Sequence, residues 1–97
     1  MDRNECISLL QSNSDVLKKE FGITSLRLFG SVARNEQNTT SDVDVFVETQ
    51  TPNPFILIDA KDFLSNIMGC PVDIIRNHRN LNPRLKKRIE RDGVAIF

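Results

Sequence analysis

Two aspartates, Asp42 and Asp44, stand two positions apart in a segment that alternates polar and apolar side chains. In a β-strand this spacing puts both carboxylates on one face. Two like charges about 4 Å apart repel by about 4 kcal/mol at an effective dielectric constant near 20, so a proton, water or a shared divalent cation must offset the repulsion. A third acidic residue, Asp73, interrupts an apolar segment, where a charge is costly unless it also faces a cation. The three carboxylates predict a site for Mg²⁺, which prefers carboxylate and phosphate oxygens.

A second group of residues, Gly30, Ser31 and Arg34, is suited to binding a phosphate. Gly30 and Ser31 lie where a predicted strand turns into a predicted helix, so the backbone can approach an anion closely and the hydroxyl can donate to it. Arg34 follows Ser31 by three residues, which on a helical turn puts its guanidinium on the same side. We expect this phosphate site to meet the carboxylates at one point.

The elements that must position these residues alternate between helix and strand. Apolar periodicity, together with Asn-Pro pairs at helix starts and glycines at helix ends, predicts an α/β (α+β) fold with a small mixed sheet of about four strands and helices packed on it. The expected helices span residues 3–20, 31–35 (a single turn), 54–68 and 83–92, and the expected strands span 25–29, 42–48, 71–75 and 94–97, with a solvated loop over 35–41.

Alternation within the 42–48 strand predicts which side chains enter the core. Val43, Val45 and Val47 would face inward, while the two aspartates face the other way together with Phe46, which could line a ligand pocket on that face. The helix over 54–68 should be well buried, because apolar side chains cover a broad face of it. These are Phe55, Ile56, Ile58, Ala60, Phe63, Leu64, Ile67 and Met68.

Length and composition narrow the class of protein. The chain has 97 residues, with 13 basic and 13 acidic side chains and 39% hydrophobic residues. We therefore expect one folded domain over residues 1–97 and no wholesale electrostatic binding to nucleic acid or membrane. No apolar run reaches the roughly 20 residues of a membrane-spanning helix. Two distant cysteines and the absence of a leader predict a cytoplasmic protein, and a single histidine, His78, excludes a zinc site built with them.

Charge is distributed unevenly along the chain. Residues 1–75 carry 6 basic and 11 acidic side chains, whereas residues 76–97 carry 7 and 2, a net −5 against a net +5. The default interpretation of the basic segment is a solvated helix face with Leu81, Leu85 and Ile89 as its buried stripe. Steering of an acidic partner surface and binding of RNA or DNA are the alternatives, and the absence of Trp and Tyr weakens the nucleic-acid interpretation.

The glycine and serine at 30–31, followed after ten residues by Asp42-Val43-Asp44, resemble the signature of the DNA polymerase β-like nucleotidyltransferase superfamily. Arg34, Ser41 and Asp73 extend the match. At this length the chain looks like the minimal nucleotidyltransferase (MNT) antitoxins, and the order of predicted elements extends the resemblance over essentially the whole chain.

The resemblance implies transfer of AMP from ATP with two Mg²⁺ ions. Asp42 and Asp44 would bind both ions, and Asp73 would hold the one carrying the acceptor hydroxyl and could take its proton. Gly30, Ser31 and Arg34 would position the triphosphate. Because no residues are left for an acceptor-binding domain, the acceptor would be a macromolecule. The resemblance names it as a cognate HEPN-domain ribonuclease toxin, whose tyrosine hydroxyl would be adenylylated in a hetero-oligomeric complex.

Each of these residues also has a plain structural interpretation. Gly30 and Ser31 could form an ordinary turn, Arg34 could be solvated or paired with an acid, and the aspartates could lie on exposed strand surface. At the level of function, the alternatives are an antitoxin that only binds and masks its partner, and a nucleic-acid-binding regulator that uses the basic segment.

Overall fold

The computed structural model describes residues 2–34, 42–51 and 53–97. The predicted loop over 35–41, including Ser41 and the last residue of the predicted 31–35 turn, lies outside this part of the chain. The helices are α1 (Arg3–Ser12), α2 (Ser14–Phe21), α3 (Gly30–Ala33), α4 (Pro54–Met68) and α5 (Pro83–Asp92), and the strands are β1 (Ile23–Phe29), β2 (Val43–Thr49), β3 (Val72–Arg76) and β4 (Val94–Ala95).

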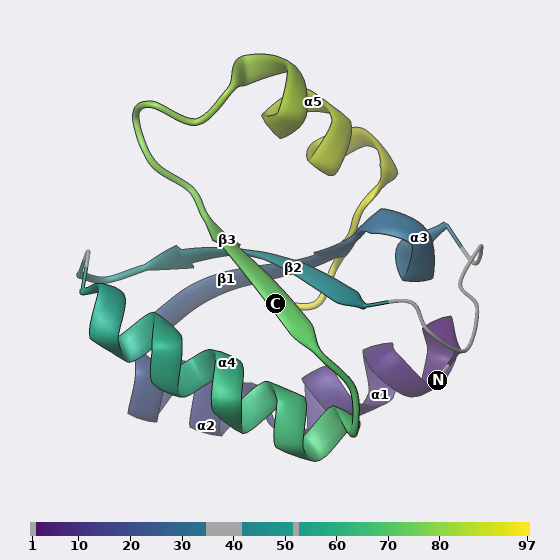
Figure 1. Cartoon of the computed structure of the whole chain (residues 1–97), viewed down its shortest axis with the longest axis vertical. Helices are drawn as coiled ribbons and strands as arrows, with labels where there is room; N and C mark the ends of the chain where they lie inside the picture. Colours follow the sequence, from purple (N-terminus) through teal and green to yellow (C-terminus); the bar gives the residue numbers. More distant parts are fainter. Residues whose placement is uncertain (1, 35–41, 52) are drawn as a thin grey trace.

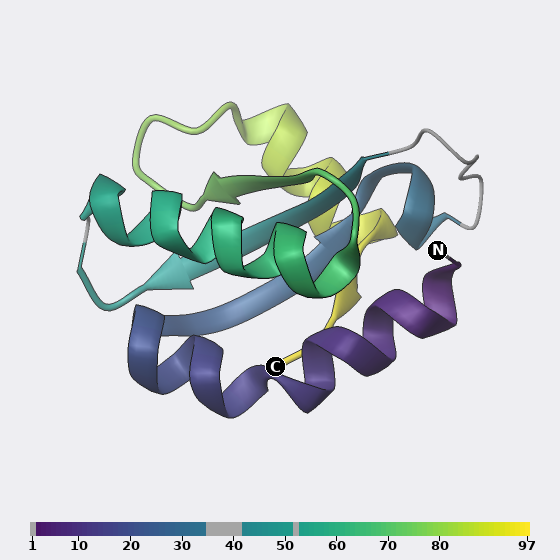
Figure 2. The same cartoon turned by 60° about the horizontal axis from the view of Figure 1, so that its bottom comes forward.

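The four strands form one mixed sheet in the order β3-β2-β1-β4. β1 pairs antiparallel with β2 and with β4, while β2 and β3 run parallel and are connected through α4. Helices α1, α2 and α4 cover one face of the sheet, and α5 lies over the other (Figures 1 and 2). The mixed four-stranded sheet predicted from the sequence is thereby confirmed.

The main core lies between the sheet and the layer of α1, α2 and α4. Val43, Val45 and Val47 are at most 1% exposed, as their alternation predicted. Cys6 belongs to this core, and burial, followed by the nearby Cys70, raises the pKa of its thiol to about 11. Cys6 is therefore a neutral packing residue at pH 7, and both cysteines are free.

Three helices begin at side chains that accept a hydrogen bond from the first turn. Oδ1 of Asp2 accepts from the backbone N–H of Glu5 at 2.8 Å in α1. The amide oxygens of Asn53 and Asn82 do the same for α4 and α5, and each asparagine is followed by a proline at the first helical position. This combination satisfies free backbone donors and presets the backbone angle, which explains why these starts were predictable.

The single helix expected over residues 3–20 is wrong, because the chain breaks into α1 and α2 at Asn13. Oγ of Ser12 donates to the carbonyl oxygen of Ser8 and Nδ2 of Asn13 donates to that of Leu9, both at 2.8 Å. Such side-chain bonds compete with the helical backbone ladder and bend the chain. The bend lets both helices follow the curved sheet (Figure 2).

The expected burial of α4 and α5 is only partly correct. Ala60, Leu64 and Met68 of α4 are buried, but Phe55 is 74% and Ile58 57% exposed. In α5, Ile89 is buried, whereas Leu81 before the helix and Leu85 within it are half-buried. Apolar periodicity identifies a helix but does not show how far the neighbouring layer extends along it.

The C-terminal end of α5 is fixed to β1. Nη1 of Arg27 lies 3.5 Å from the carbonyl oxygens of Glu90 and Gly93. A β-carbon on Gly93 would overlap the carbonyl oxygen of Ile89 and come within 2.8 Å of Cδ of Arg27. Glycine is therefore required by close packing at this point.

No helix in the described part of the chain is both long and apolar enough to cross a membrane.

Candidate active site

The strand register brings Asp44 and Asp73 together. The two residues are direct partners in the parallel pairing of β2 with β3, and Phe29 at the end of β1 is the antiparallel partner of Asp44. Neighbouring paired residues present their side chains on the same face of a sheet. The carboxylate strands and the glycine that follows β1 therefore meet on the sheet face opposite the main core.

Gly30 packs directly against Asp44. Its φ angle is +81°, a left-handed conformation that L-residues rarely adopt, and a β-carbon there would overlap Oδ2 of Asp44. This contact joins the predicted phosphate-binding turn to the predicted metal-binding strand, as the sequence led us to expect.

The electrostatics around Asp44 disfavour its charged form. Burial, the largest effect, raises the pKa of Asp44 above its usual 3.8; the charges of Asp73 and Asp42 raise it further, and Arg34 partly opposes them. Asp44 therefore lies within electrostatic reach of the other two aspartates and the predicted phosphate-binding arginine. A cation at this point would relieve both the burial and the repulsion.

Asp42 and Asp73 are more exposed than Asp44. Asp42 directly precedes β2, and Oδ1 of Asp73 lies 3.9 Å from Nζ of Lys61 on α4, with 54% of the Asp73 side chain exposed. Within residues 2–34, 42–51 and 53–97, no three acidic, histidine or cysteine side chains converge closely enough to form a ready metal site. The fold places the three aspartates in one region, and metal ligation by them stays a prediction.

Ser31 and Arg34 lie on or directly after the single turn α3 that follows β1. The backbone N–H of Arg34 donates to the carbonyl oxygen of Gly30 at 3.2 Å, which closes this turn. Ser31 is half-buried and Arg34 is exposed. The expected helical turn is confirmed as far as Arg34, and the roles of both side chains toward a phosphate stay predictions.

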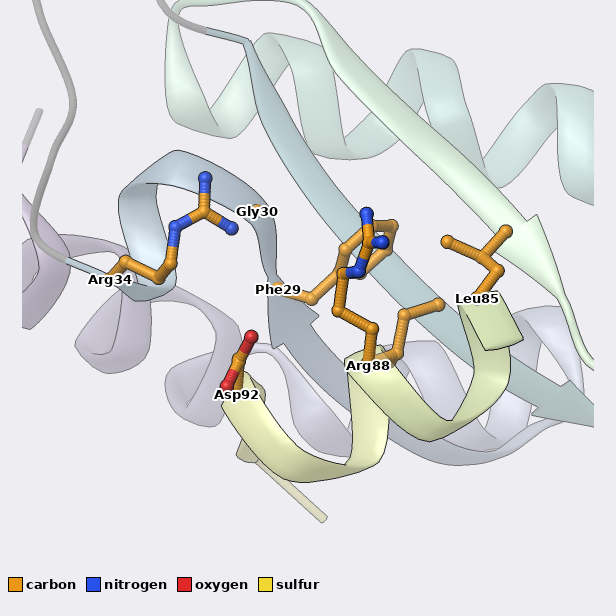
Figure 3. Close-up of a pocket in the computed structure, with 7 residues that line it drawn as sticks. Phe29, Gly30, Arg34, Leu85, Arg88 and Asp92 are labelled. Carbon is orange, nitrogen blue, oxygen red and sulfur yellow. The ribbon is translucent and has the colours of Figure 1, made fainter. Parts of the chain in front are cut away.

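A cavity of about 150 Å³ opens beside Gly30, between the end of β1, α3 and α5. Figure 3 shows Arg34, which directly follows α3, with Arg88 and Asp92 from α5, around this cavity. Its lining residues are Phe29, Gly30, Arg34, Leu85, Arg88, Ile89 and Asp92. Phe46, expected as a candidate pocket residue, is buried, with 6% of its surface exposed, and is not one of the residues that line this cavity.

The contribution of α5 to this region was not predicted from the sequence. Arg88 and Asp92 are 54 or more residues away from Arg34 along the chain, and they belong to a basic helix that was assigned to solvent or to a partner. The available signal was their spacing: Leu85, Arg88, Ile89 and Asp92 stand at positions i, i+3, i+4 and i+7 and so share one helix face.

The chain is similar to known proteins over nearly its whole length. Residues 11–96 match the family model described as nucleotidyltransferase domain. The chain is 37% identical over 94 residues to a candidate protein adenylyltransferase of Methanocaldococcus jannaschii, and the match covers 96% of both chains. A solved structure of a candidate minimal nucleotidyltransferase superposes with a TM-score of 0.79 at 30% identity, covering 97% of this chain and 95% of the other.

A third similarity concerns the fold alone. A chain from the complex of a tri-AMPylated Shewanella oneidensis HEPN toxin with an MNT antitoxin superposes with a TM-score of 0.67 at 17% identity, covering 94% of this chain and 71% of that one.

An aspartate-bearing parallel strand pair beside a glycine turn, together with these matches, defines the class of protein as a nucleotidyltransferase. The chain belongs to the nucleotidyltransferase domain family, within the minimal group expected from its sequence.

Proposed function

We propose that this chain is a protein adenylyltransferase that moves AMP from ATP to a tyrosine hydroxyl of a cognate HEPN ribonuclease toxin and so acts as its antitoxin in the cytoplasm. The observation that carries the proposal is the contact between Gly30 and Asp44, because it joins the predicted phosphate-binding turn to the paired strands that carry Asp44 and Asp73. A protein is proposed as the acceptor because a relative over nearly the whole chain is named as a protein adenylyltransferase. A HEPN toxin is proposed as the partner because the fold is similar to that of a chain from a complex of a HEPN toxin with an MNT antitoxin.

The reaction is an in-line displacement at the α-phosphorus of ATP. The acceptor oxygen forms a bond to this phosphorus, the bond to the bridging oxygen of pyrophosphate breaks, and the hydroxyl proton leaves. Asp73 is the proposed acceptor of this proton, since it is exposed beside Asp44 on the neighbouring strand. Ser31 and Arg34 hold the triphosphate so that pyrophosphate departs opposite the incoming oxygen.

The donor set fits Mg²⁺. Asp42, Asp44 and Asp73 offer hard carboxylate oxygens, and their mutual repulsion together with the burial of Asp44 disfavours three charges without a cation. These three residues would hold two ions. When bound, Mg²⁺ supplies neutralisation of the negative charge that develops on the phosphoryl oxygens.

The test is to incubate this protein with the protein encoded beside it, ATP and Mg²⁺, and then to measure the intact mass of that partner. Wild type should add one or more AMP units to the partner, and fragmentation should place them on tyrosine. The double variant Asp42→Asn/Asp44→Asn should add none. A matched control, Asp59→Asn/Asp62→Asn, removes two exposed carboxylates from α4 and should transfer AMP as wild type does.

Two results would overturn the proposal. If wild type and the Asp42/Asp44 variant bind and neutralise the partner equally without any AMP gain, the chain acts by masking alone. If transfer by wild type is unchanged after chelation of divalent cations, the carboxylates do not work through Mg²⁺.

A further inference from the structure

We propose that Arg88 on α5 is a second triphosphate-binding arginine, which closes on the β- and γ-phosphates of ATP from the side opposite Arg34. The inference rests on the proposed function, because it names a further binding residue for the same nucleotide.

The cavity connects Arg88 to the predicted phosphate-binding turn. Gly30, Arg34 and Arg88 all line it, so the turn and the α5 arginine share one space (Figure 3). A volume of about 150 Å³ is below the roughly 300 Å³ at which ligand pockets begin, so the cavity accommodates part of a nucleotide. In this proposal the part of the nucleotide inside the cavity, next to Gly30, is the β- and γ-phosphate group that is bonded to the reacting α-phosphate.

The polar rim of the cavity is mostly basic. Asp92 also lines the cavity, but both of its carboxylate oxygens accept from Arg91, at 3.0 Å from Nε and 3.3 Å from Nη2. The pKa of Asp92 is lowered first by Arg91 and further by Arg34 and Arg88, which places these charges in one neighbourhood. Arg34 and Arg88 line the cavity together with Asp92, whose charge is paired with Arg91, so the rim keeps an excess of positive charge that suits an anion.

The donors of the two lining arginines match phosphate oxygens. A guanidinium group has five N–H donors and no acceptor, so it matches a group made of acceptor oxygens. The edge of a nucleobase mixes donors with acceptors, whereas the β- and γ-phosphates offer acceptor oxygens only. Two arginines on opposite sides of a small cavity therefore fit a pyrophosphate group better than a base.

The helix that carries Arg88 is held firmly against the sheet. The neighbouring residue Ile89 is 2% exposed, and Arg27 of β1 reaches the carbonyl oxygens at the end of α5. The backbone of Arg88 is thereby fixed relative to β1 and the turn that follows it. Ordering one side chain on a fixed backbone costs less entropy than ordering a loop.

The test measures equilibrium binding by calorimetry with three probes: ATP, inorganic tripolyphosphate and adenosine. Arg88→Ala should weaken ATP and tripolyphosphate by about 10- to 100-fold, the loss expected for hydrogen bonds between charged groups, and should leave adenosine unchanged. Arg88→Lys should recover only part of this loss, because an ammonium group cannot bind in the bidentate manner. The control Lys87→Ala removes an equal charge from the exposed side of the same helix and should change affinity by less than about threefold.

Equal affinities of Arg88→Ala and Lys87→Ala for tripolyphosphate would overturn the inference. So would a loss for adenosine as large as that for ATP, because Arg88 would then contact the base or the ribose. Wild type that binds none of the phosphate probes would overturn the inference together with the proposed function. Wild type that binds ATP without transferring AMP contradicts the proposed function alone, and in that case the comparison of the two variants still decides the role of Arg88.

Discussion

Gly30 and Asp44 depend on each other. The positive φ of Gly30 is possible because the residue has no β-carbon, and the same absence leaves room for the Asp44 carboxylate. Replacement of Gly30 should therefore strain the backbone and displace the Asp44 carboxylate at the same time. These two effects can be separated with Gly69, which has a similar φ of +69°. Among the described residues beyond its own chain neighbours, no atom lies within 4 Å of the place that a β-carbon on Gly69 would take.

We expect Gly30→Ala and Gly69→Ala to destabilise the fold by different amounts. Both should lose about 1–2 kcal/mol from left-handed strain, and Gly30→Ala should lose more because its new methyl group displaces the Asp44 carboxylate. AMP transfer should fall by at least about 100-fold in Gly30→Ala and stay near wild type in Gly69→Ala. Urea unfolding and transfer rates measure the two effects. Equal transfer by both variants would show that the contact with Asp44 does not matter.

Among single residues, the sequence singled out Gly30, Asp44 and Asp73, which the fold brings together, and their chemical roles stay predictions. Asp42, Asp44 and Gly30 stand in a short motif, so the strand and turn geometry that relates them is local. Asp73 was predictable because a charge inside an apolar strand needs a reason. Arg88 was not predictable, since its place beside Gly30 depends on how α5 crosses the sheet, which is long-range packing rather than local pattern.

For the helix α5, the sequence predicted the bounds but not the place in the fold. Its start at Asn82-Pro83 and its end near Asp92 were correct, because caps are local signals. Its contribution to the cavity beside Gly30 was not predicted, because most of its surface is charged and nothing in the sequence says which side of the helix lines that cavity. The prediction of one helix over residues 3–20 was wrong for a local reason. The side-chain hydrogen bonds of Ser12 and Asn13 interrupt the helix although the apolar pattern continues.

The packing of the C-terminal end of α5 against β1 should be sensitive to one methyl group added at Gly93. Gly93→Ala keeps an ordinary φ, but its β-carbon meets Arg27 and the carbonyl oxygen of Ile89, so we expect a loss of about 1–3 kcal/mol in stability and weaker ATP binding. In an Arg27→Ala background one of the two clashes is gone, and the same substitution should destabilise the fold less. Thermal unfolding of the four proteins in this double-mutant cycle measures the coupling. Strictly additive losses would show that the new methyl group at position 93 does not meet the side chain of Arg27.

The uneven charge along the chain becomes a local balance in the folded molecule. The basic helix α5 lies over the sheet face opposite the main core (Figure 1), and the register of β2 with β3 puts Asp44 and Asp73 on that same face. Opposite charges that are distant in sequence thus face a common region, which suits the proposed triphosphate and its cations because these also carry both signs. The net charge of zero hides this arrangement, and only the topology reveals it.

The whole molecule should gain stability when Asp44 loses its charge. The raised pKa of Asp44 means that the protonated form favours folding below the pKa of the unfolded chain, and that this contribution is lost as the pH rises through the folded value. At pH 7 the charged carboxylate therefore opposes folding. Without ligand, Asp44→Asn should melt about 2–5 °C above wild type, and this difference should vanish near pH 3, where both side chains are neutral.

Ligand binding should reverse that order of stability. A ligand that binds only the folded state at about 100 times its Kd adds about 2.7 kcal/mol, which for a domain of this size raises the melting temperature by about 10–20 °C. ATP with Mg²⁺ should produce this rise in wild type and much less in Asp44→Asn, so the two melting curves should exchange places. The same carboxylate then destabilises the empty fold and stabilises the loaded one, which is the behaviour of a binding residue rather than a structural one. If Asp44→Asn melts below wild type without ligand, or if both proteins respond equally to ATP with Mg²⁺, Asp44 is a structural residue and not part of the nucleotide site.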